Sequence, residues 1–197
     1  MLIDTDHLHH WIQAIRQSSD PMRTMDAFWA GQIKSKEWLI DNIEIYLGFE
    51  TTIDIHGGWV GVLASMLFQT YPYLGVIRSI DIDSECKNIA TTMNKLEEME
   101  KRFVAITGDM CNVESTADII INTSCEHITQ QQYELWLNKL PQESLIVLQS
   151  NNFDIPEHIR IANNIEDFKN QSKLNQIYFE GELDLPKYKR FMVIGSR

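Results

Sequence analysis

The chain has 197 residues, of which 44% are hydrophobic and 23% are charged. This is the composition of a globular protein, and it excludes a long disordered or fibrous chain. The 17 Lys and Arg side chains against 28 Asp and Glu give a formal net charge of −11 at pH 7. A surface this negative repels phosphate backbones and therefore argues against bulk binding to nucleic acid or to anionic membranes.

The cysteines and the apolar runs bear on the cellular compartment of the protein. Cys86, Cys111 and Cys125 are widely spaced and form no Cys-x-x-Cys pair, so neither a disulfide framework nor a zinc motif is predicted. The first residues are too polar for a signal peptide, and the longest apolar run, residues 59–68, is too short to cross a bilayer. These features predict a soluble, cytoplasmic protein with no membrane association.

Residues 1–48 predict a helical extension that packs on the core of the protein. Pro21 follows small polar residues, which is the pattern of a helix start. Four large apolar residues then recur at helical spacing and predict one buried face: Met22, Met25, Phe28 and Trp29. Gly31 is expected to end this helix, and Ser35 to cap the next one.

Basic side chains of this extension allow two interpretations each. His7, His9 and His10 could form a metal cluster, but a frayed, solvated helix is the favoured interpretation. Lys34 and Lys36 could contact a carboxylate of a cofactor or substrate, although most lysines are only solvated. The sequence leaves the role of these two lysines open.

From residue 49 onward, short β-branched runs alternate with helical segments. Strands are predicted over residues 51–55, 73–80, 103–106, 117–121 and 144–149, and helices over residues 59–68, 84–98 and 129–140. This alternation indicates βαβ crossovers and a mainly parallel sheet with helices on both faces. Two further runs, residues 176–183 and 188–194, are joined by a short linker and should form an antiparallel hairpin. The sequence thus predicts an α/β fold with about seven strands.

Polar residues that follow these strands mark the predicted ligand site, because open α/β sheets bind ligands at the carboxyl ends of their strands. The first strand leads into a glycine turn that ends at Gly61, and such a turn allows a ligand to approach the backbone beside a helix start. Asp81 ends the second strand about twenty residues later, a spacing suited to a ribose diol. Asp109 follows the third strand, and the polar run 122–127 follows the fourth.

In this order and spacing the chain resembles the class I S-adenosylmethionine-dependent methyltransferases, over about residues 51–197. The resemblance implies a Rossmann-like fold, with a methyltransferase domain over residues 49–197 and S-adenosyl-L-methionine as cofactor. It also implies that the glycine turn holds the methionine part, Asp81 the ribose and Asp109 the adenine amino group. The implied cofactor-binding residues are Asp54, Gly57, Gly58, Trp59, Gly61, Asp81, Asp109 and Asn122. His56 departs from the family, which usually has a glycine at this position.

A nicotinamide-dependent dehydrogenase is the rival interpretation of the nucleotide site. The segment from His56 to Gly61 lacks the Gly-x-Gly-x-x-Gly spacing of that class, and the C-terminal hairpin is unlike its fold. The methyltransferase interpretation is therefore favoured.

The residues after the fourth and fifth strands bear on the methyl acceptor. Asn122 is not followed by the Pro-Pro-aromatic run that related enzymes use for methylating base amino groups. The strand-end residues Asn122 and 150–152 are neutral and poor ligands for a hard divalent cation, so no metal is predicted. Asn122, Ser124 and Asn151 are expected to bind the substrate.

Glu126 and His127 are the predicted catalytic residues. Histidine titrates near neutrality and burial can tune a glutamate, so either could deprotonate an acceptor. The alternative interpretations are structural: Glu126 could cap the helix that begins near Thr129, and His127 could be packed at a strand end.

These observations lead us to expect methyl transfer to a polar small-molecule acceptor. An RNA or protein methyltransferase that uses a local patch is one alternative, and a catalytically silent methyltransferase-like binding module is another. The sequence identifies neither the acceptor, nor the methylated atom, nor the oligomeric state.

Overall fold

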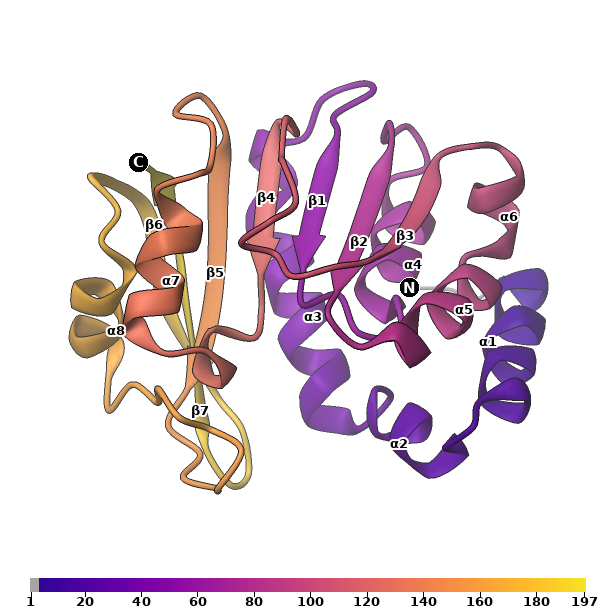
Figure 1. The fold of residues 1–197 in the computed structure, drawn as a ribbon, viewed down its shortest axis with the longest axis horizontal. Helices are drawn as coiled ribbons and strands as arrows, with labels where there is room; N and C mark the ends of the chain where they lie inside the picture. Colours follow the sequence, from indigo (N-terminus) through magenta and orange to yellow (C-terminus); the bar gives the residue numbers. More distant parts are fainter. Residues whose placement is uncertain (1–3) are drawn as a thin grey trace. The chain divides into compact units, whose positions relative to one another are not determined.

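The computed structural model describes residues 4–197. Its seven strands follow the order β3-β2-β1-β4-β5-β7-β6 (Figure 1). This confirms the predicted α/β fold, a mainly parallel sheet with an antiparallel C-terminal hairpin and a helical N-terminal segment. The chain divides into two units, Met1–Asp109 and Met110–Arg197. The predicted boundary after residue 48 falls inside the first unit and stays a prediction, and residues 1–3 of the predicted extension lie outside the described residues.

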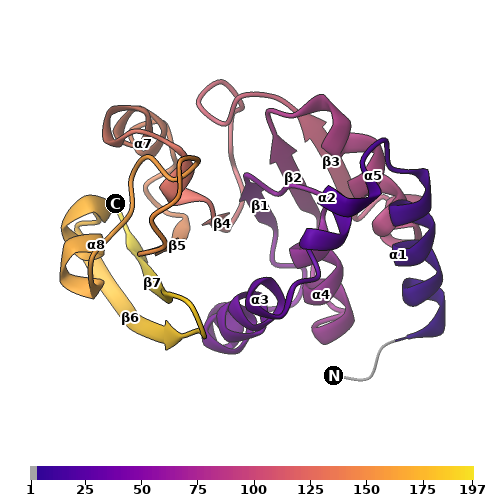
Figure 2. The same cartoon turned by 90° about the horizontal axis from the view of Figure 1, so that it is seen from below.

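The first unit begins with helices. They are α1 (Thr5–Gln17), α2 (Pro21–Asp26), α3 (Ala30–Ile43) and the short 3-10 helix η1 (Glu44–Tyr46). Asp4 caps α1 by accepting the backbone N–H of Asp6, and Asp20 caps α2 with Pro21 in its first turn. Helix α1 packs beside helix α5 (Ser84–Met93) in both views (Figures 1 and 2).

The predicted apolar stripe of this segment is wrong. Met22, Met25 and Trp29 are 70%, 50% and 64% exposed. The reason is that α2 has only six residues and ends at Asp26, so the helical period does not continue through residue 29.

The predicted boundary inside the segment is also wrong. Gly31 lies in the first turn of α3 and Ser35 is buried in its interior, so neither ends nor caps a helix. Lys34 is exposed, and Nζ of Lys36 donates to Oε1 of Gln32 at 2.9 Å.

The sheet of the first unit is parallel. Its strands are β1 (Ile53–His56), β2 (Ile77–Asp81) and β3 (Phe103–Thr107), with β2 between the other two. Helix α4 (Val62–Thr70) follows β1, and α5 and α6 (Lys95–Met99) follow β2. All four residues of β1 are buried, two of them isoleucines and the other two the polar residues Asp54 and His56. The parallel register brings the carboxyl ends of all three strands to one edge, where Gly57, Asp81 and Asp109 end or follow these strands.

The start of α1 is anchored rather than frayed. Nε2 of His7 lies 2.8 Å from Oε1 of the buried Glu97, which belongs to α6. The predicted solvated N-terminal helix is therefore wrong at His7.

The second unit joins two parallel strands to the hairpin. Its elements are β4 (Ile119–Asn122), the 3-10 helix η2 (Cys125–His127), α7 (Gln130–Leu137), β5 (Leu145–Asn151), α8 (Ile165–Ser172), β6 (Gln176–Asp184) and β7 (Lys189–Ser196). Strand β5 pairs parallel with β4 and antiparallel with β7. The core of the unit contains Tyr133 and Trp136 from α7 and Phe168 from α8.

Across residues 4–197, none of the helices combines the length and apolarity that a membrane span needs.

Candidate functional site

The glycine turn of the first unit lies directly against the end of β2. The backbone N–H groups of Gly57 and Gly58 both donate to the carbonyl of Ile80, at 2.9 and 3.0 Å. Gly57 has φ 69°, which glycine adopts without strain. A Cβ added to Gly58 would lie 2.0 Å from Oγ of Ser79, so only glycine fits this close approach. The turn therefore depends on its glycines for both conformation and packing.

The turn ends at the start of α4, whose first N–H groups have no side-chain cap. Gly61 has φ 81°, and its carbonyl accepts a hydrogen bond from Nδ2 of Asn94 at 3.1 Å. Asn94 also separates α5 from α6, so the predicted helix over residues 84–98 is interrupted at the residue that holds the turn. Uncapped N–H groups at the positive end of a helix favour a negatively charged ligand group.

Asp81 links the end of β2 to this turn. Its Oδ2 accepts the backbone N–H of Trp59 at 2.8 Å, and its Oδ1 accepts that of Asp83 at 3.0 Å. Because a carboxylate oxygen accepts more than one hydrogen bond, the half-buried Asp81 keeps capacity for a ligand hydroxyl. Ile82, which the sequence analysis missed, follows directly and is 74% exposed. An isoleucine between two acids, Asp81 and Asp83, directly after a strand is the sequence signal that could have identified it.

The segment after β3 lies against the same strand end. The N–H of Gly108 donates to the carbonyl of Asp81 at 2.9 Å, and Asp109 follows, half-buried. The structure therefore brings the turn at Trp59, the acid Asp81 and the segment before Asp109 together at one edge.

Asp54 and His56 belong to the interior of the sheet. The carboxylate of Asp54 is 1% exposed and binds the guanidinium of Arg78 through both oxygens, with Nε at 2.7 Å from Oδ1. Burial lowers the pKa of His56 to about 4, so this imidazole is neutral at pH 7. The cofactor role expected for Asp54 stays a prediction.

In the second unit, Glu126 lies buried in η2, the short helix that follows β4. Its side chain is 3% exposed, and Oε1 accepts hydrogen bonds from Nδ2 of Asn151 at 2.6 Å and from Nη1 of Arg190 at 2.7 Å. Oε2 is buried and has no hydrogen-bond partner. The helix cap of α7 is Thr129, which forms a capping box with Gln132, so the alternative role of Glu126 as a cap is wrong.

His127, next to Glu126, is exposed rather than packed at a strand end. Its Nδ1 lies 3.0 Å from the carbonyl oxygen of Glu157. A carbonyl only accepts, so Nδ1 carries the proton and Nε2 of the neutral ring keeps a lone pair. The ring lies edge-on to that of His158, with centroids 4.8 Å apart. His127 can therefore accept a proton or bind a ligand through Nε2.

The residues expected to bind substrate are mostly engaged within the loop. Oδ1 of Asn122 accepts the N–H of Ser124 at 2.9 Å, and Oδ1 of Asn151 accepts the N–H of Phe153 at 2.8 Å. Asn122 and Asn151 are only 1% and 2% exposed, whereas Ser124 is half-buried. Their ligand-binding roles stay predictions, as does the cofactor role of Asn122.

Arg190 and His158, which the sequence did not indicate, contact the two predicted catalytic residues: Arg190 binds Glu126, and the ring of His158 packs on that of His127. Arg190 is the second residue of β7 and follows Lys189, before the apolar run 191–194. A basic pair at the start of a strand resembles a solvated strand end, so the sequence carries no signal that marks Arg190. His158 lies in the long connection between β5 and α8, where the sequence pattern gives no indication of its neighbours.

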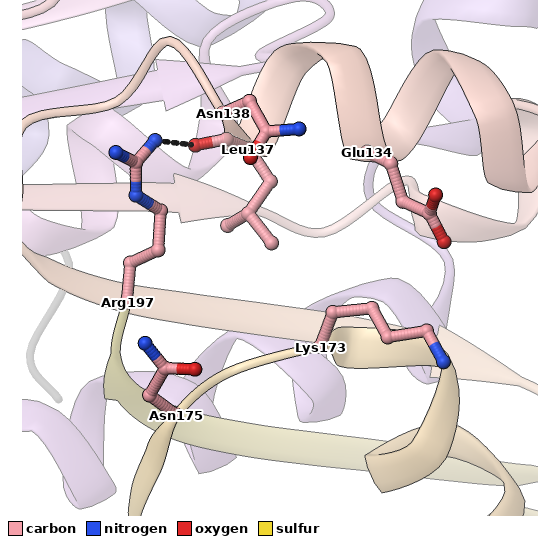
Figure 3. A pocket seen from close by; sticks show the side chains of 6 residues that line it. All are labelled: Glu134, Leu137, Asn138, Lys173, Asn175 and Arg197. Carbon is pink, nitrogen blue, oxygen red and sulfur yellow. Dashed lines mark hydrogen bonds between the residues drawn. The ribbon is translucent and has the colours of Figure 1, made fainter.

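A pocket of about 430 Å³ lies elsewhere in the second unit (Figure 3). It is lined by Glu134, Leu137, Asn138, Lys173, Asn175 and Arg197. Arg197 follows the end of β7, which lies beside the amino end of β5, and Asn175 precedes β6, whose start pairs with the end of β7. Because ligands of such sheets bind at the opposite, carboxyl edge, this pocket is not part of the candidate site.

Comparisons with known proteins agree with this architecture. No family model matches the sequence, and no curated protein matches it. Among solved structures, magnesium protoporphyrin IX methyltransferase from Synechocystis PCC 6803 with bound SAH is similar with a TM-score of 0.66 and 13% identity, covering 98% of this chain and 95% of that one. The small RNA methyltransferase HEN1 is similar with a TM-score of 0.68 and 17% identity, covering 83% of this chain and 25% of that one.

The pyocyanin biosynthetic protein PhzM is similar with a TM-score of 0.65 and 14% identity over 94% of this chain. This chain spans only 62% of the length of that protein. At these identities the comparisons show a shared fold.

Proposed function

We propose that this chain, which has the fold of the class I S-adenosylmethionine-dependent methyltransferases, transfers a methyl group to a polar small-molecule acceptor. The observation that carries the proposal is the hydrogen bond from the N–H of Trp59 to Asp81, which joins the glycine turn to a strand-end acid. Through this hydrogen bond, a carboxylate that would accept the ribose hydroxyls lies beside a turn whose backbone a ligand can approach closely.

The chemistry of the first unit fits S-adenosylmethionine. The oxygens of Asp81 would accept the ribose hydroxyls, and the exposed Ile82 offers an apolar surface to the face of adenine. Asp109 would accept the adenine amino group. Gly57, Gly58 and the uncapped start of α4 would hold the methionine part, whose carboxylate suits the positive helix end. The bound cofactor would supply a methyl group on a positively charged sulfur.

The loop after β4 in the second unit supplies the groups that suit an acceptor. The hydrogen bonds of these side chains engage Oε1 of Glu126 and Nδ1 of His127. Oε2 of Glu126 and Nε2 of His127 therefore keep lone pairs that could bind an acceptor. Arg190 and Asn151 hold Glu126 in place, so this carboxylate would orient the acceptor while the exposed His127 takes its proton. Such groups suit a hydroxyl, amine or carboxylate better than a flat aromatic acceptor.

The net charge of −11 supports a small acceptor over RNA, because an acidic surface repels phosphates. The likeness to a small RNA methyltransferase keeps RNA as the second candidate. None of the three cysteines forms a disulfide in the described part of the chain, which supports a cytoplasmic setting.

Transfer from methyl-radiolabelled S-adenosylmethionine into separated metabolite, RNA and protein fractions of a cell extract tests the proposal. We expect label in the metabolite fraction with the natural chain, and none with the Asp81→Ala variant. Label chiefly in RNA or protein would contradict the proposed acceptor. Label in no fraction would contradict the activity and favour a silent binding module.

A further inference from the structure

Three potential metal ligands converge on the surface of the second unit. Glu126, His127 and His158 each offer one donor atom, and these atoms all lie within 4.8 Å of one another. Within the described part of the chain, residues 4–197, this is the one such group of three or more His, Cys, Asp or Glu side chains. Glu126 and His127 come from η2, and His158 comes from the connection after β5.

The hydrogen bonds of these side chains leave one lone pair free on each. Nδ1 of His127 donates to the carbonyl of Glu157 at 3.0 Å, and Nδ1 of His158 donates to the carbonyl of Phe153 at 2.7 Å. Both neutral rings therefore keep a lone pair on Nε2. Oε1 of Glu126 is held by Arg190, while Oε2 is buried without a partner. A buried carboxylate oxygen without a partner is costly unless something binds it.

The same hydrogen bonds are those that support metal ligands in proteins. A ligating histidine almost always donates its other N–H to a carbonyl or carboxylate, and ligating carboxylates are themselves hydrogen-bonded. Here both imidazoles donate to backbone carbonyls, and Asn151 and Arg190 hold the carboxylate. We propose that Glu126, His127 and His158 bind one divalent first-row transition-metal ion.

The ring geometry agrees with one shared ion. Two imidazoles bound at tetrahedral zinc, with Zn–N bonds of about 2 Å, have ring centres about 5 Å apart. The centroids of His127 and His158 are 4.8 Å apart with the rings 76° from coplanar. Ligand atoms on one ion lie about 3–4 Å apart, whereas these donor atoms lie within 4.8 Å of one another, so the side chains would turn to bring the donor atoms closer on binding. The exposure of His127 leaves room for that movement.

The donor set selects among ions. Two imidazole nitrogens and one carboxylate suit zinc, iron, cobalt or manganese, whereas magnesium and calcium prefer oxygen donors only. The guanidinium of Arg190, 2.7 Å from Glu126, opposes the positive ion and should weaken its binding relative to an unpaired carboxylate. The expectation of no metal rested on the neutral residues Asn122 and 150–152, and it did not include His158.

Three protein ligands leave at least one position open on the ion. A hydroxyl, amine or carboxylate of the acceptor would fill that position. With the ion bound, Nε2 of His127 is a ligand and does not take the acceptor's proton; the ion would instead make a bound hydroxyl lose its proton to water more readily than a free one. Activation of an acceptor by the ion rests on the proposed function, whereas binding of the ion to the three side chains does not.

Calorimetry on the full chain, freed of metal with a chelator, tests the site with Zn²⁺, Co²⁺ and Mn²⁺, and with Mg²⁺ as the oxygen-preferring control. We expect one equivalent of Zn²⁺ or Co²⁺ to bind, with visible absorption bands from Co²⁺. The variants His127→Ala and His158→Ala should weaken binding at least tenfold. The matched variant His9→Ala, which removes an exposed histidine of α1, should leave it unchanged.

Circular dichroism and thermal unfolding of each variant establish that it is folded. Absence of saturable binding of all three transition ions would overturn the proposal. Binding that survives in His158→Ala but is lost in a His9→Ala/His10→Ala double variant would also overturn it, because the ion would then sit in α1. Metal binding without S-adenosylmethionine binding would contradict the proposed function and leave the metal site standing.

Discussion

Oε1 of Glu126 lies 2.7 Å from Nη1 of Arg190, and the two residues are 3% and 6% exposed. The pair joins η2, which follows β4, to β7, across 64 residues of sequence. A buried charge that loses its partner is strongly destabilising, although replacing both charges together costs far less. The pair therefore governs both the stability of the second unit and the position of the candidate acceptor loop.

Removing the cation alone should destabilise the chain. We expect Arg190→Met to lower the free energy of unfolding by about 3–5 kcal/mol, and Glu126→Gln/Arg190→Met to recover most of that loss. Guanidinium denaturation followed by circular dichroism measures both. Lys189→Met is the matched control, because its ion pair with Glu182 is half exposed and should contribute less than about 1 kcal/mol. Equal losses for the two single variants would contradict this account of the pair.

His127→Ala should affect chemistry without affecting the fold. His127 serves either as the proton acceptor or as a ligand to the ion that activates the acceptor, and its loss should slow transfer by about a hundredfold or more in both cases, whereas the cofactor residues of the first unit are untouched. Methyl transfer measured under saturating S-adenosylmethionine, alongside cofactor affinity, separates the two effects. An unchanged rate in His127→Ala, compared with His9→Ala, would exclude a part for His127 in the reaction.

The alternation of short strands and helices predicted the fold correctly, because parallel strands need crossovers and a short linker forces the hairpin. The same pattern failed at Met22 and Met25, where helical spacing continues past the point at which α2 ends. Helix α8 was not predicted because only Phe168 and Ser172 of its eight residues are buried, which leaves no apolar stripe.

The candidate site was predictable where it is local in sequence and not where it depends on tertiary contacts. The glycine turn and Asp81 follow directly from strand ends, and the structure joins them by the hydrogen bond from Trp59. The contacts of Glu126 with Arg190 and of His127 with His158 link residues 64 and 31 positions apart. Strand pairing and the paths of the loops determine such contacts, and the spacing of residues in the sequence does not predict them.

Gly58→Ala should strain the turn. The added Cβ would lie 2.0 Å from Oγ of Ser79, and overpacking of this kind costs about 1–3 kcal/mol of unfolding free energy. Adding Ser79→Ala removes the clashing oxygen and should restore most of the stability. Gly48→Ala is the control, since its Cβ would meet its nearest neighbour, Thr51, at an ordinary 3.6 Å. Urea denaturation of the natural chain and these three variants measures the effect, and a double variant no more stable than Gly58→Ala would contradict the clash.

His56 should make stability depend on pH. Burial lowers its pKa from 6.5 to about 4, so between these pH values the unfolded chain binds a proton that the folded chain does not. The free energy of unfolding should therefore fall as pH falls from about 6.5 to 4, by about 3 kcal/mol from this residue. Denaturation curves at pH 7 and pH 4 for the natural chain and His56→Gln measure the difference. A variant that loses as much stability as the natural chain over this range would contradict the role of His56.

The most direct test of the account is calorimetry of the full chain with S-adenosylmethionine. The natural chain should bind one equivalent, and Asp81→Ala should bind at least tenfold more weakly, because hydrogen bonds to a charged group contribute about 1.5–3 kcal/mol each. Asp83→Asn is the matched control, since Asp83 caps α5 and pairs with Arg23 instead of reaching the glycine turn. It should lose some stability and keep the affinity of the natural chain. Absence of binding by the natural chain, or equal affinity in Asp81→Ala, would contradict the central claim.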